Sequence, residues 1–542
     1  MSDISIDQQS TTKGFAILSM AGIIGKVLSI LYIPFLRKII GEAGIGVYNI
    51  AYTIYVFLYV IANSGIPVAI SKSISELIAL GNYKDAIRAF KISRMLLFII
   101  GLVLSIGMFV FAEPLSKYMQ DGKTTAKLAI MALAPTLLVT SILSTYRGYF
   151  QGRSNMTPTA ISQVVEQLFN IIFSLFFAYI FYNKFGVEAG VAGGTVGTFV
   201  GALVAVIILI LFYEKNKKIR VVKEHKVVKT RYSNKRLLRK ILAYSVPMTV
   251  CVALLNIGAL LDNKIITHVL PTIGISEHNV DVMVGLIYQY NTLINVPIAI
   301  ISSLAVAVLP AISGYAALND KKALGSKISY AYRLCLLIAI PSAVGLFSLS
   351  GGICRFLAYS ENVAPLLRIG ALNLILMGVV QIQTSILQGV GRIRLVTVHA
   401  FIGIVFKVII EIITMKYINI NAILLGNFIC FGVQILLNCR AIKSTLRIKF
   451  HIAKKAIKIA FSSLVMGLVA FLMHYIIYSV FHIFLGTSYI FNAIATIVAI
   501  IAAVYIYLYV LILTAGIRKK DFDVLPKRLI KFIPNFMLVD LI

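Results

Sequence analysis

The sequence carries little charge for its length, and acidic residues are especially few. Only 13% of the 542 residues are charged, whereas soluble domains usually have about 25%. The acidic residues number 20 against 51 lysines and arginines, and 59% of all residues are hydrophobic. The mean hydropathy is +0.93. This composition excludes an ordinary soluble domain.

Cysteine is also scarce, and its spacing excludes two common kinds of site. The five cysteines form no paired spacing and lie mostly in apolar segments. Neither a disulfide framework nor a zinc site is therefore indicated, and we predict no metal and no cofactor. The five are Cys251, Cys335, Cys354, Cys430 and Cys439.

The short alternating segments of a transmembrane barrel are absent as well. Instead, apolar runs of 18 or more residues recur from end to end, each long enough to cross a hydrocarbon core of about 30 Å. We predict an all-α polytopic membrane protein with about fourteen transmembrane helices. No small-residue cleavage pattern follows the first run, so we expect a retained helix there. The expected spans are residues 15–36, 45–70, 94–112, 126–149, 158–181, 187–213, 239–262, 282–312, 328–349, 363–388, 395–415, 422–439, 457–479 and 489–515.

The placement of the basic residues predicts the orientation of these spans. An even number of spans puts both termini on one side. If that side is the cytoplasm, 39 of the 51 lysines and arginines fall on cytoplasmic segments and 9 on outer loops, as the positive-inside rule requires. The other three, Lys26, Arg368 and Lys407, lie inside helices. The net charge of +31 is thus explained by topology and by contact with membrane lipids, without a nucleic-acid partner.

The two halves of the chain resemble each other. "RGYFQGRSN" (Arg147–Asn155) and "ILQGVGRIR" (Ile386–Arg394) close corresponding helices at an offset of 237 residues. "PVAISKSIS" (Pro67–Ser75) and "LPAISGYAA" (Leu309–Ala317) do so at an offset of 242. Parallel repeats of this kind are typical of transporters that hold substrate between two bundles. The predicted parts are a six-helix N-lobe (1–213), a basic cytoplasmic linker (214–238), a six-helix C-lobe (239–443), two further helices (444–515) and a basic cytoplasmic tail (516–542).

Lys26 is a positive charge inside the first span. It is the twelfth residue from Phe15, so at 1.5 Å per residue it lies roughly 16 Å along the helix, near the middle of the bilayer. A lysine at that depth costs about 2.5–3.5 kcal/mol on insertion scales. It should therefore face water, a counter-charge or an anionic ligand. We favour the ligand; the alternative is an ion pair inside the bundle.

The span 158–181 carries one polar face. Its polar residues recur at spacings of three and four, which places them on one side of a helix. Amides and a carboxylate in this pattern suit sugar hydroxyls, or a proton or cation; the alternative is hydrogen bonding between helices. The stripe consists of Thr159, Gln163, Glu166, Gln167, Asn170 and Ser174.

Gly193, Gly197 and Gly201 repeat every four residues in the next span. Small residues at this spacing let two helix backbones approach closely. We therefore predict close helix packing along this face and no binding role for it.

Tyrosines form a second face in the span 45–70. Tyr48, Tyr52, Tyr55 and Tyr59 share one side of the helix and are followed by Asn63, and the equivalent span 282–312 carries Tyr288, Asn291 and Asn295. Tyrosine rings can stack on sugars, although interfacial anchoring and ordinary packing are alternatives. The predicted cavity residues are Lys26, Tyr52, Tyr55, Asn63, Gln163, Glu166, Gln167, Asn170, Asn291 and Asn295.

Three further charged residues are candidates for coupling or gating. Lys407 and Glu411 lie four residues apart in one span, so they can pair with each other. Arg147 closes the fourth span. Ionisable residues inside membrane spans often mark transport pathways.

Several of these stretches resemble a known family. "GIGVYNIAYTIYVFLYVIANSGIPVAISKSISE" (Gly44–Glu76), "RGYFQGRSNMTPTAISQVVEQ" (Arg147–Gln167) and the fourteen expected helices resemble the MOP flippase superfamily. The closest resemblance is to its bacterial polysaccharide-biosynthesis branch, which holds the stage V sporulation protein B group and the lipid II flippases related to MurJ. The similarity covers nearly the whole chain.

This resemblance implies a function and a location. It implies two lobes around a cationic cavity in the bacterial plasma membrane, which binds the pyrophosphate and sugar of an undecaprenyl-linked precursor and turns it outward without ATP. Cell-wall synthases are candidate partners. Lys26 falls on one of the basic cavity positions of the family, and another such position is Tyr32 here.

Three alternatives to a flippase are open. A MATE-like drug or cation antiporter should have twelve helices and a cavity dominated by carboxylates. A membrane glycosyltransferase needs catalytic residues in sizeable outer loops, and the longest expected outer loop, Asn263–Asp281, has about nineteen residues without a convincing cluster. A scaffold without transport has no supporting feature. We predict a flippase and not an enzyme.

Overall fold

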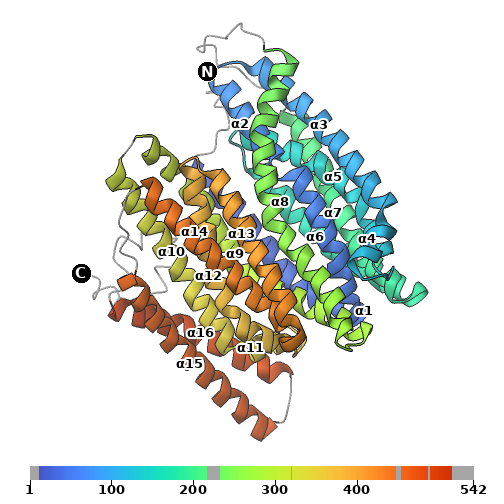
Figure 1. The fold of residues 1–542 in the computed structure, drawn as a ribbon, viewed down its shortest axis with the longest axis vertical. Coiled ribbons are helices and arrows are strands. Elements are labelled where there is room, and N and C mark those ends of the chain that lie inside the picture. Colours follow the sequence, from blue (N-terminus) through green and yellow to red (C-terminus); the bar gives the residue numbers. More distant parts are fainter. Residues whose placement is uncertain (1–10, 217–231, 319, 447–452, 486–488, 515–542) are drawn as a thin grey trace. The chain divides into compact units, whose positions relative to one another are not determined.

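The computed structural model describes residues 11–216, 232–318, 320–446, 453–485 and 489–514 (Figure 1). Within these ranges the chain forms α-helices and no strands, which confirms the predicted all-α class. The helices are α1 (Thr11–Asn63), α2 (Ile66–Ala79), α3 (Tyr83–Val110), α4 (Ala112–Met119), α5 (Lys127–Gly152), α6 (Thr157–Phe185), α7 (Val187–Asn216), α8 (Asn234–Thr272), α9 (Glu277–Ala317), α10 (Lys321–Ser348), α11 (Ser350–Phe356), α12 (Val363–Gly389), α13 (Ile393–Ile418), α14 (Asn421–Leu446), α15 (Ala453–Leu485) and α16 (Tyr489–Leu513).

Thirteen segments among the described residues are long and apolar enough to cross a membrane. The first of them, Ile17–Ile78, takes in two predicted spans, 15–36 and 45–70. Its main helix, α1, is two helices joined at Gly41, where φ is 77° and ψ is 175°. Glycine adopts this conformation readily, whereas a Cβ atom would strain it. The polytopic fold with about fourteen spans is therefore confirmed.

The predicted outer loop Asn263–Asp281 is wrong. Helix α8 runs on through this region, and only residues 273–276 separate it from α9. Hydropathy marks the part of a helix that lies in hydrocarbon, and a helix continues beyond that part when its polar residues find partners. Asn263 does so, because its side chain accepts a hydrogen bond of 3.2 Å from the amide of Asn49.

The chain divides into two compact units. The first contains Met1–Tyr288 and Ile404–Ile423, and the second contains Gln289–Gly403 and Leu424–Ile542. Their boundaries differ from those of the predicted lobes, since α8 and the C-terminal part of α13, from Ile404 on, pack within the first unit. Most of the predicted linker and the whole predicted tail lie outside the described residues.

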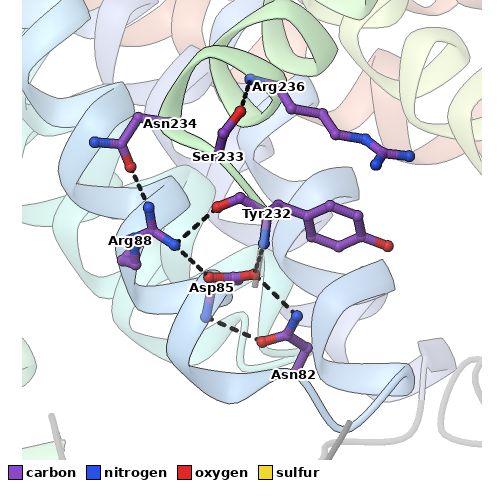
Figure 2. Close-up of polar contacts among 7 residues, drawn as sticks. All are labelled: Asn82, Asp85, Arg88, Tyr232, Ser233, Asn234 and Arg236. Atoms are coloured by element: carbon purple, nitrogen blue, oxygen red, sulfur yellow. Dashed lines mark hydrogen bonds and ion pairs between the residues drawn. The ribbon is translucent and has the colours of Figure 1, made fainter. Parts of the chain in front are cut away.

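A network of polar contacts fixes the beginning of α8 to α3 in the first unit (Figure 2). The buried carboxylate of Asp85 accepts hydrogen bonds from the backbone N–H of Tyr232 at 2.8 Å and from Asn82 at 3.0 Å. Arg88 donates to Asp85 at 2.8 Å, to the carbonyl oxygen of Tyr232 at 2.9 Å, and to Asn234. A hydrogen-bonded, ion-paired carboxylate of this kind holds two segments in one register. The last part of the predicted linker is thereby anchored where α8 begins.

Helices α6 and α7 approach each other closely along the predicted glycine stripe. A Cβ atom on Gly193 would lie 2.4 Å from the carbonyl oxygen of Phe177, and one on Gly197 would lie 2.2 Å from that of Asn170. A Cβ atom on Gly201 would lie 2.4 Å from the backbone carbonyl oxygen of Glu166. Backbone atoms cannot move aside as flexible side chains do. The prediction of close packing is confirmed, and the packing holds the polar face of α6 in position.

The second unit gathers α10, α12 and α15, and α16 packs against α15 (Figure 1). Small and flexible side chains fill the contact between the last two helices and α10. This core cluster consists of Leu349, Met466, Ala470, Ala499 and Ala503.

Replacing Gly197 by leucine is expected to destabilise the protein by about 1–3 kcal/mol, the usual result of overpacking. The temperature of thermal unfolding of the purified protein measures this. Gly107→Leu is the matched control, because Gly107 is also helical and nothing lies within 4 Å of an added Cβ atom there. Equal unfolding temperatures for the two variants would contradict the packing described for α6 and α7.

Candidate functional site

The polar face of α6 is shared between helix contacts and unpaired groups. Gln167 donates a hydrogen bond of 3.1 Å to Ser29 on α1. The side-chain oxygen of Asn170 accepts hydrogen bonds from Ser174 at 3.0 Å and from Thr198 on α7 at 3.4 Å. In contrast, the side-chain oxygen of Gln163 is buried and has no hydrogen-bond partner. Part of the stripe therefore joins helices, and part of it is available to a ligand.

Glu166 on this face forms an ion pair with Arg147 of α5. Nη2 of Arg147 lies 2.6 Å from Oε2 of Glu166, and Nε donates to Ser162 at 3.1 Å. Both side chains are largely buried, 13% and 24% exposed. The structure thus pairs Glu166, a predicted cavity residue, with Arg147, a predicted coupling or gating residue.

The predicted tyrosine face is a continuous ladder of rings. Tyr48 and Tyr52 stack with their centroids 5.6 Å apart and an interplanar angle of 11°. Tyr52 and Tyr55 follow at 5.7 Å, and Tyr55 and Tyr59 at 6.0 Å. Tyr288 on α9 continues the ladder from Tyr48 at 5.8 Å. Ring–ring packing therefore accounts for part of this face. Tyr52, Tyr59 and Tyr288 are the partly exposed members of the ladder, and Tyr48 and Tyr55 are buried.

Asn63 ends α1 with an unsatisfied amide. Its side chain is buried, and neither its oxygen nor its nitrogen has a hydrogen-bond partner. A buried polar group without a partner costs about 1–3 kcal/mol. Bound water or a polar ligand would remove this cost, which makes Asn63 a stronger candidate than its sequence position alone suggested.

Lys26 carries a charge without a compensating carboxylate. Its side chain is exposed, and it makes no hydrogen bond or ion pair with any of the residues that the structure describes. Ser29, one turn further along the same face of α1, is the residue that Gln167 contacts. Lys26 therefore lies on the side of α1 that contacts the polar stripe of α6.

Asn291 and Asn295 lie on α9 in the second unit, where both side chains are partly exposed. They remain predictions from the sequence.

Lys407 belongs to a buried group of three charges that the sequence only half revealed. Its Nζ lies 2.7 Å from Oδ1 of Asp262 on α8, but 3.8 Å from Oε1 of Glu411. The side chains are buried: Lys407 is 6% exposed, Asp262 is 9% exposed and Glu411 is 0% exposed. Lys407 and Glu411 are thus within ion-pair distance, as the sequence allowed, but the closer partner of Lys407 is Asp262. The sequence did not reveal Asp262 as the partner of Lys407, because 145 residues separate the two. In the sequence, Asp262 stands out only as a lone acidic residue at the end of an apolar span.

Glu411 is the weakly bound member of this charge triad. Neither of its carboxyl oxygens has a hydrogen-bond partner, although both are buried. Two carboxylates and one ammonium group would carry a net negative charge, which is expensive in a buried site. The triad can accordingly take up one further positive charge.

The fold defines the class of protein. It resembles the structure titled "Lipid II flippase MurJ, inward closed conformation" with a TM-score of 0.67 and 17% identity, over 91% of this chain and 98% of that one. It also resembles an inward-facing multidrug resistance MATE family transporter of the MOP superfamily, with a TM-score of 0.63 and 17% identity, over 78% of this chain and 95% of that one. This is the fold of the MOP superfamily of membrane transporters.

The sequence comparisons then identify the family within that class. The chain belongs to the polysaccharide biosynthesis protein family, whose pattern matches residues 11–316. The lipid II flippase MurJ of Bacillus subtilis (strain 168) is 23% identical over 483 residues, covering 86% of this chain and 88% of that protein. The stage V sporulation protein B of the same organism is 25% identical over 402 residues, covering 74% and 77%. The chain is therefore a multi-pass membrane transporter of the MurJ and stage V sporulation protein B branch, as the sequence resemblance predicted.

Replacing Lys407 by methionine is expected to destabilise the protein by about 3–5 kcal/mol, because it leaves two buried carboxyl groups without their counter-charge. Removing Asp262 as well (K407M with D262L) should restore part of the loss. Denaturant unfolding of the purified protein measures both effects. Lys416→Met is the control, because Lys416 is exposed on the same helix. A double variant as unstable as the sum of the two single variants would contradict the pairing.

Proposed function

We propose that the protein is a flippase for an undecaprenyl-pyrophosphate-linked cell-wall precursor, either lipid II or a related polysaccharide intermediate. It moves this lipid from the inner to the outer leaflet by alternating access. The observation that carries the proposal is the exposed ammonium group of Lys26, which lies near the middle of a membrane span without a carboxylate partner among the described residues. An anionic phosphate supplies the missing counter-charge. Relatives named as a lipid II flippase and a sporulation protein support this choice of cargo.

The unpaired polar groups of the first unit suit the sugar part of such a cargo. Asn63 and Gln163 hold buried amide atoms without partners, which can bind sugar hydroxyls. The partly exposed ring of Tyr52 offers a flat apolar surface for a sugar ring. Gln167 and Asn170 already bond to neighbouring helices, and in this proposal they hold the face in place while donating any remaining hydrogen bonds to the cargo.

The paired charges are proposed to couple or gate the movement. The pair Arg147–Glu166 is buried and satisfied in this conformation. The triad Asp262–Lys407–Glu411 is buried as well, but only Asp262 is held closely by Lys407, and both carboxyl oxygens of Glu411 lack a hydrogen-bond partner. Charges buried in this way separate only if another partner replaces the lost one. A bound cation or proton at the triad, or the cargo itself at the pair, can take that role during the change between inward and outward states.

The proposed location is the bacterial plasma membrane, with both termini in the cytoplasm and with cell-wall synthases as candidate partners. In this account the protein transports its substrate chemically unchanged, as a flippase and not as an enzyme.

A drug or cation antiporter is the second candidate, because the fold also resembles a MATE family transporter and because Asp262 and Glu411 place two buried carboxyl groups in the first unit. A cationic drug would require those carboxyl groups to be free. Lys407 lies 2.7 Å from Asp262, so the nearer carboxylate already has its cation, and we favour the flippase.

Lys26→Ala is expected to abolish flipping in a strain that lacks other lipid II flippases, with normal amounts of the protein in the membrane. Losing a charge-assisted contact to phosphate costs about 1.5–3 kcal/mol, so transport should fall roughly tenfold or more. Lys26→Arg keeps the charge and should keep much of the activity. The measurement is the amount and identity of the lipid-linked precursor that accumulates on the inner leaflet.

Lys38→Ala provides the control, because Lys38 is an exposed lysine on the same helix. Full complementation by Lys26→Ala would contradict the assignment of Lys26. Resistance to cationic drugs that depends on the protein, without any change in lipid-linked precursors, would instead support the antiporter.

A further inference from the structure

A groove with one positive charge lies within the second unit, between α10, α12 and α15. Its cavity volume is about 960 Å³, at the upper end of the range for small-molecule sites, about 300–1,000 Å³. Phe347, Leu372, Leu468 and Phe471 line it and are all exposed. Because these three helices are candidate membrane spans and the lining side chains are exposed, we expect the groove to face the hydrocarbon of the bilayer. Its walls suit an acyl chain.

Arg368 is the charged residue of this groove. It is the sixth residue of α12, so it lies about 8 Å from the beginning of that helix. Its Nε donates a hydrogen bond of 3.1 Å to Ser350, where α11 begins. Among the described residues no carboxylate lies within ion-pair distance of Arg368, and both of its Nη groups are left for another partner. An arginine this close to the end of a membrane span can reach the interface with its long side chain, where the phosphates of lipid headgroups are available.

Arg355, unlike Arg368, has a carboxylate partner among the described residues. Arg355 of α11 forms an ion pair of 2.9 Å with Glu361, and both side chains are exposed. The carboxylate closest in sequence to Arg368 is therefore already bound to another guanidinium group. The guanidinium group of Arg368 is therefore open to an anionic partner from outside the described protein.

We propose that this groove binds an anionic phospholipid, with its phosphate on the guanidinium group of Arg368 and one acyl chain along Phe347, Leu372 and Leu468. A guanidinium fork donates two parallel hydrogen bonds to a phosphate, and the apolar walls receive the chain. In the orientation predicted from the lysines and arginines, this lipid belongs to the outer leaflet. The bound lipid bridges α15 to α10 and α12. The site does not depend on the cargo proposed above.

The absence of tryptophan from the chain allows a direct test. Phe347→Trp gives the full-length protein a single tryptophan in the groove. In reconstituted vesicles, its fluorescence is titrated with phosphatidylglycerol or phosphatidylcholine brominated on the acyl chains. Phe109→Trp is the matched control, because Phe109 lies one residue before the end of α3, as Phe347 does in α10, and the two are 51% and 55% exposed.

At Phe347→Trp, phosphatidylglycerol is expected to bind about tenfold more strongly than phosphatidylcholine, since a charge-assisted hydrogen bond contributes about 1.5 kcal/mol or more. At Phe109→Trp the two lipids should quench equally. Adding Arg368→Gln should remove the preference, Arg368→Lys should keep part of it, and Arg355→Gln should leave it unchanged.

Three outcomes would overturn the proposal. The first is equal quenching by both lipids at Phe347→Trp, and the second is a preference that persists in Arg368→Gln or is lost equally in Arg355→Gln. The third is displacement of the brominated phosphatidylglycerol by undecaprenyl phosphate at concentrations where unlabelled phosphatidylglycerol is ineffective, which would assign the groove to the cargo carrier. Because precursor flipping is not measured here, failure of this site is distinguishable from failure of the proposed function.

Discussion

Hydrocarbon makes an isolated charge expensive, and this constraint organises the structure. Arg147 is paired with Glu166, and Lys407 with Asp262, at distances of 2.6 and 2.7 Å. Each pair joins two different helices, so charge compensation also fixes helix positions. Lys26 and Arg368 are the exceptions among the intramembrane cations discussed above, because neither has a carboxylate partner among the described residues. Our two binding proposals follow from these exceptions.

Backbone geometry places the polar groups where they can act together. The glycines of α7 bring its backbone against α6, so the polar face of α6 is held next to α1 and α7. The positive φ of Gly41 turns the chain between the two parts of α1. Lys26 precedes this turn and the tyrosine ladder follows it. A charged group and a row of aromatic rings are thereby carried by one helical element of the first unit, which suits the phosphate-linked sugar that we propose as cargo.

Sequence reasoning was most successful where the signal is local. The period of the α6 stripe, the spacing of the three glycines and the length of the apolar runs each follow from helix geometry, and the resemblance to the family rests on continuous stretches. Sequence reasoning failed where the two partners of a contact are far apart in the sequence. Asp262 could not be matched to Lys407 across 145 residues, and the loop expected at Asn263–Asp281 is helical because Asn263 bonds to Asn49 on another helix. Hydropathy contains no information on either contact.

If Lys26 binds the phosphate of a cargo lipid, its side chain faces water or an anionic ligand and not acyl chains. A variant without the native cysteines and with Lys26→Cys, treated in intact vesicles with a membrane-impermeant thiol reagent, tests it most directly. Val103→Cys, at an exposed apolar position inside the α3 span, reports a lipid-facing site. We predict that the cysteine at 26 reacts, that the cysteine at 103 does not, and that added lipid II slows the reaction at 26. Equal lack of reaction at both positions would contradict the account.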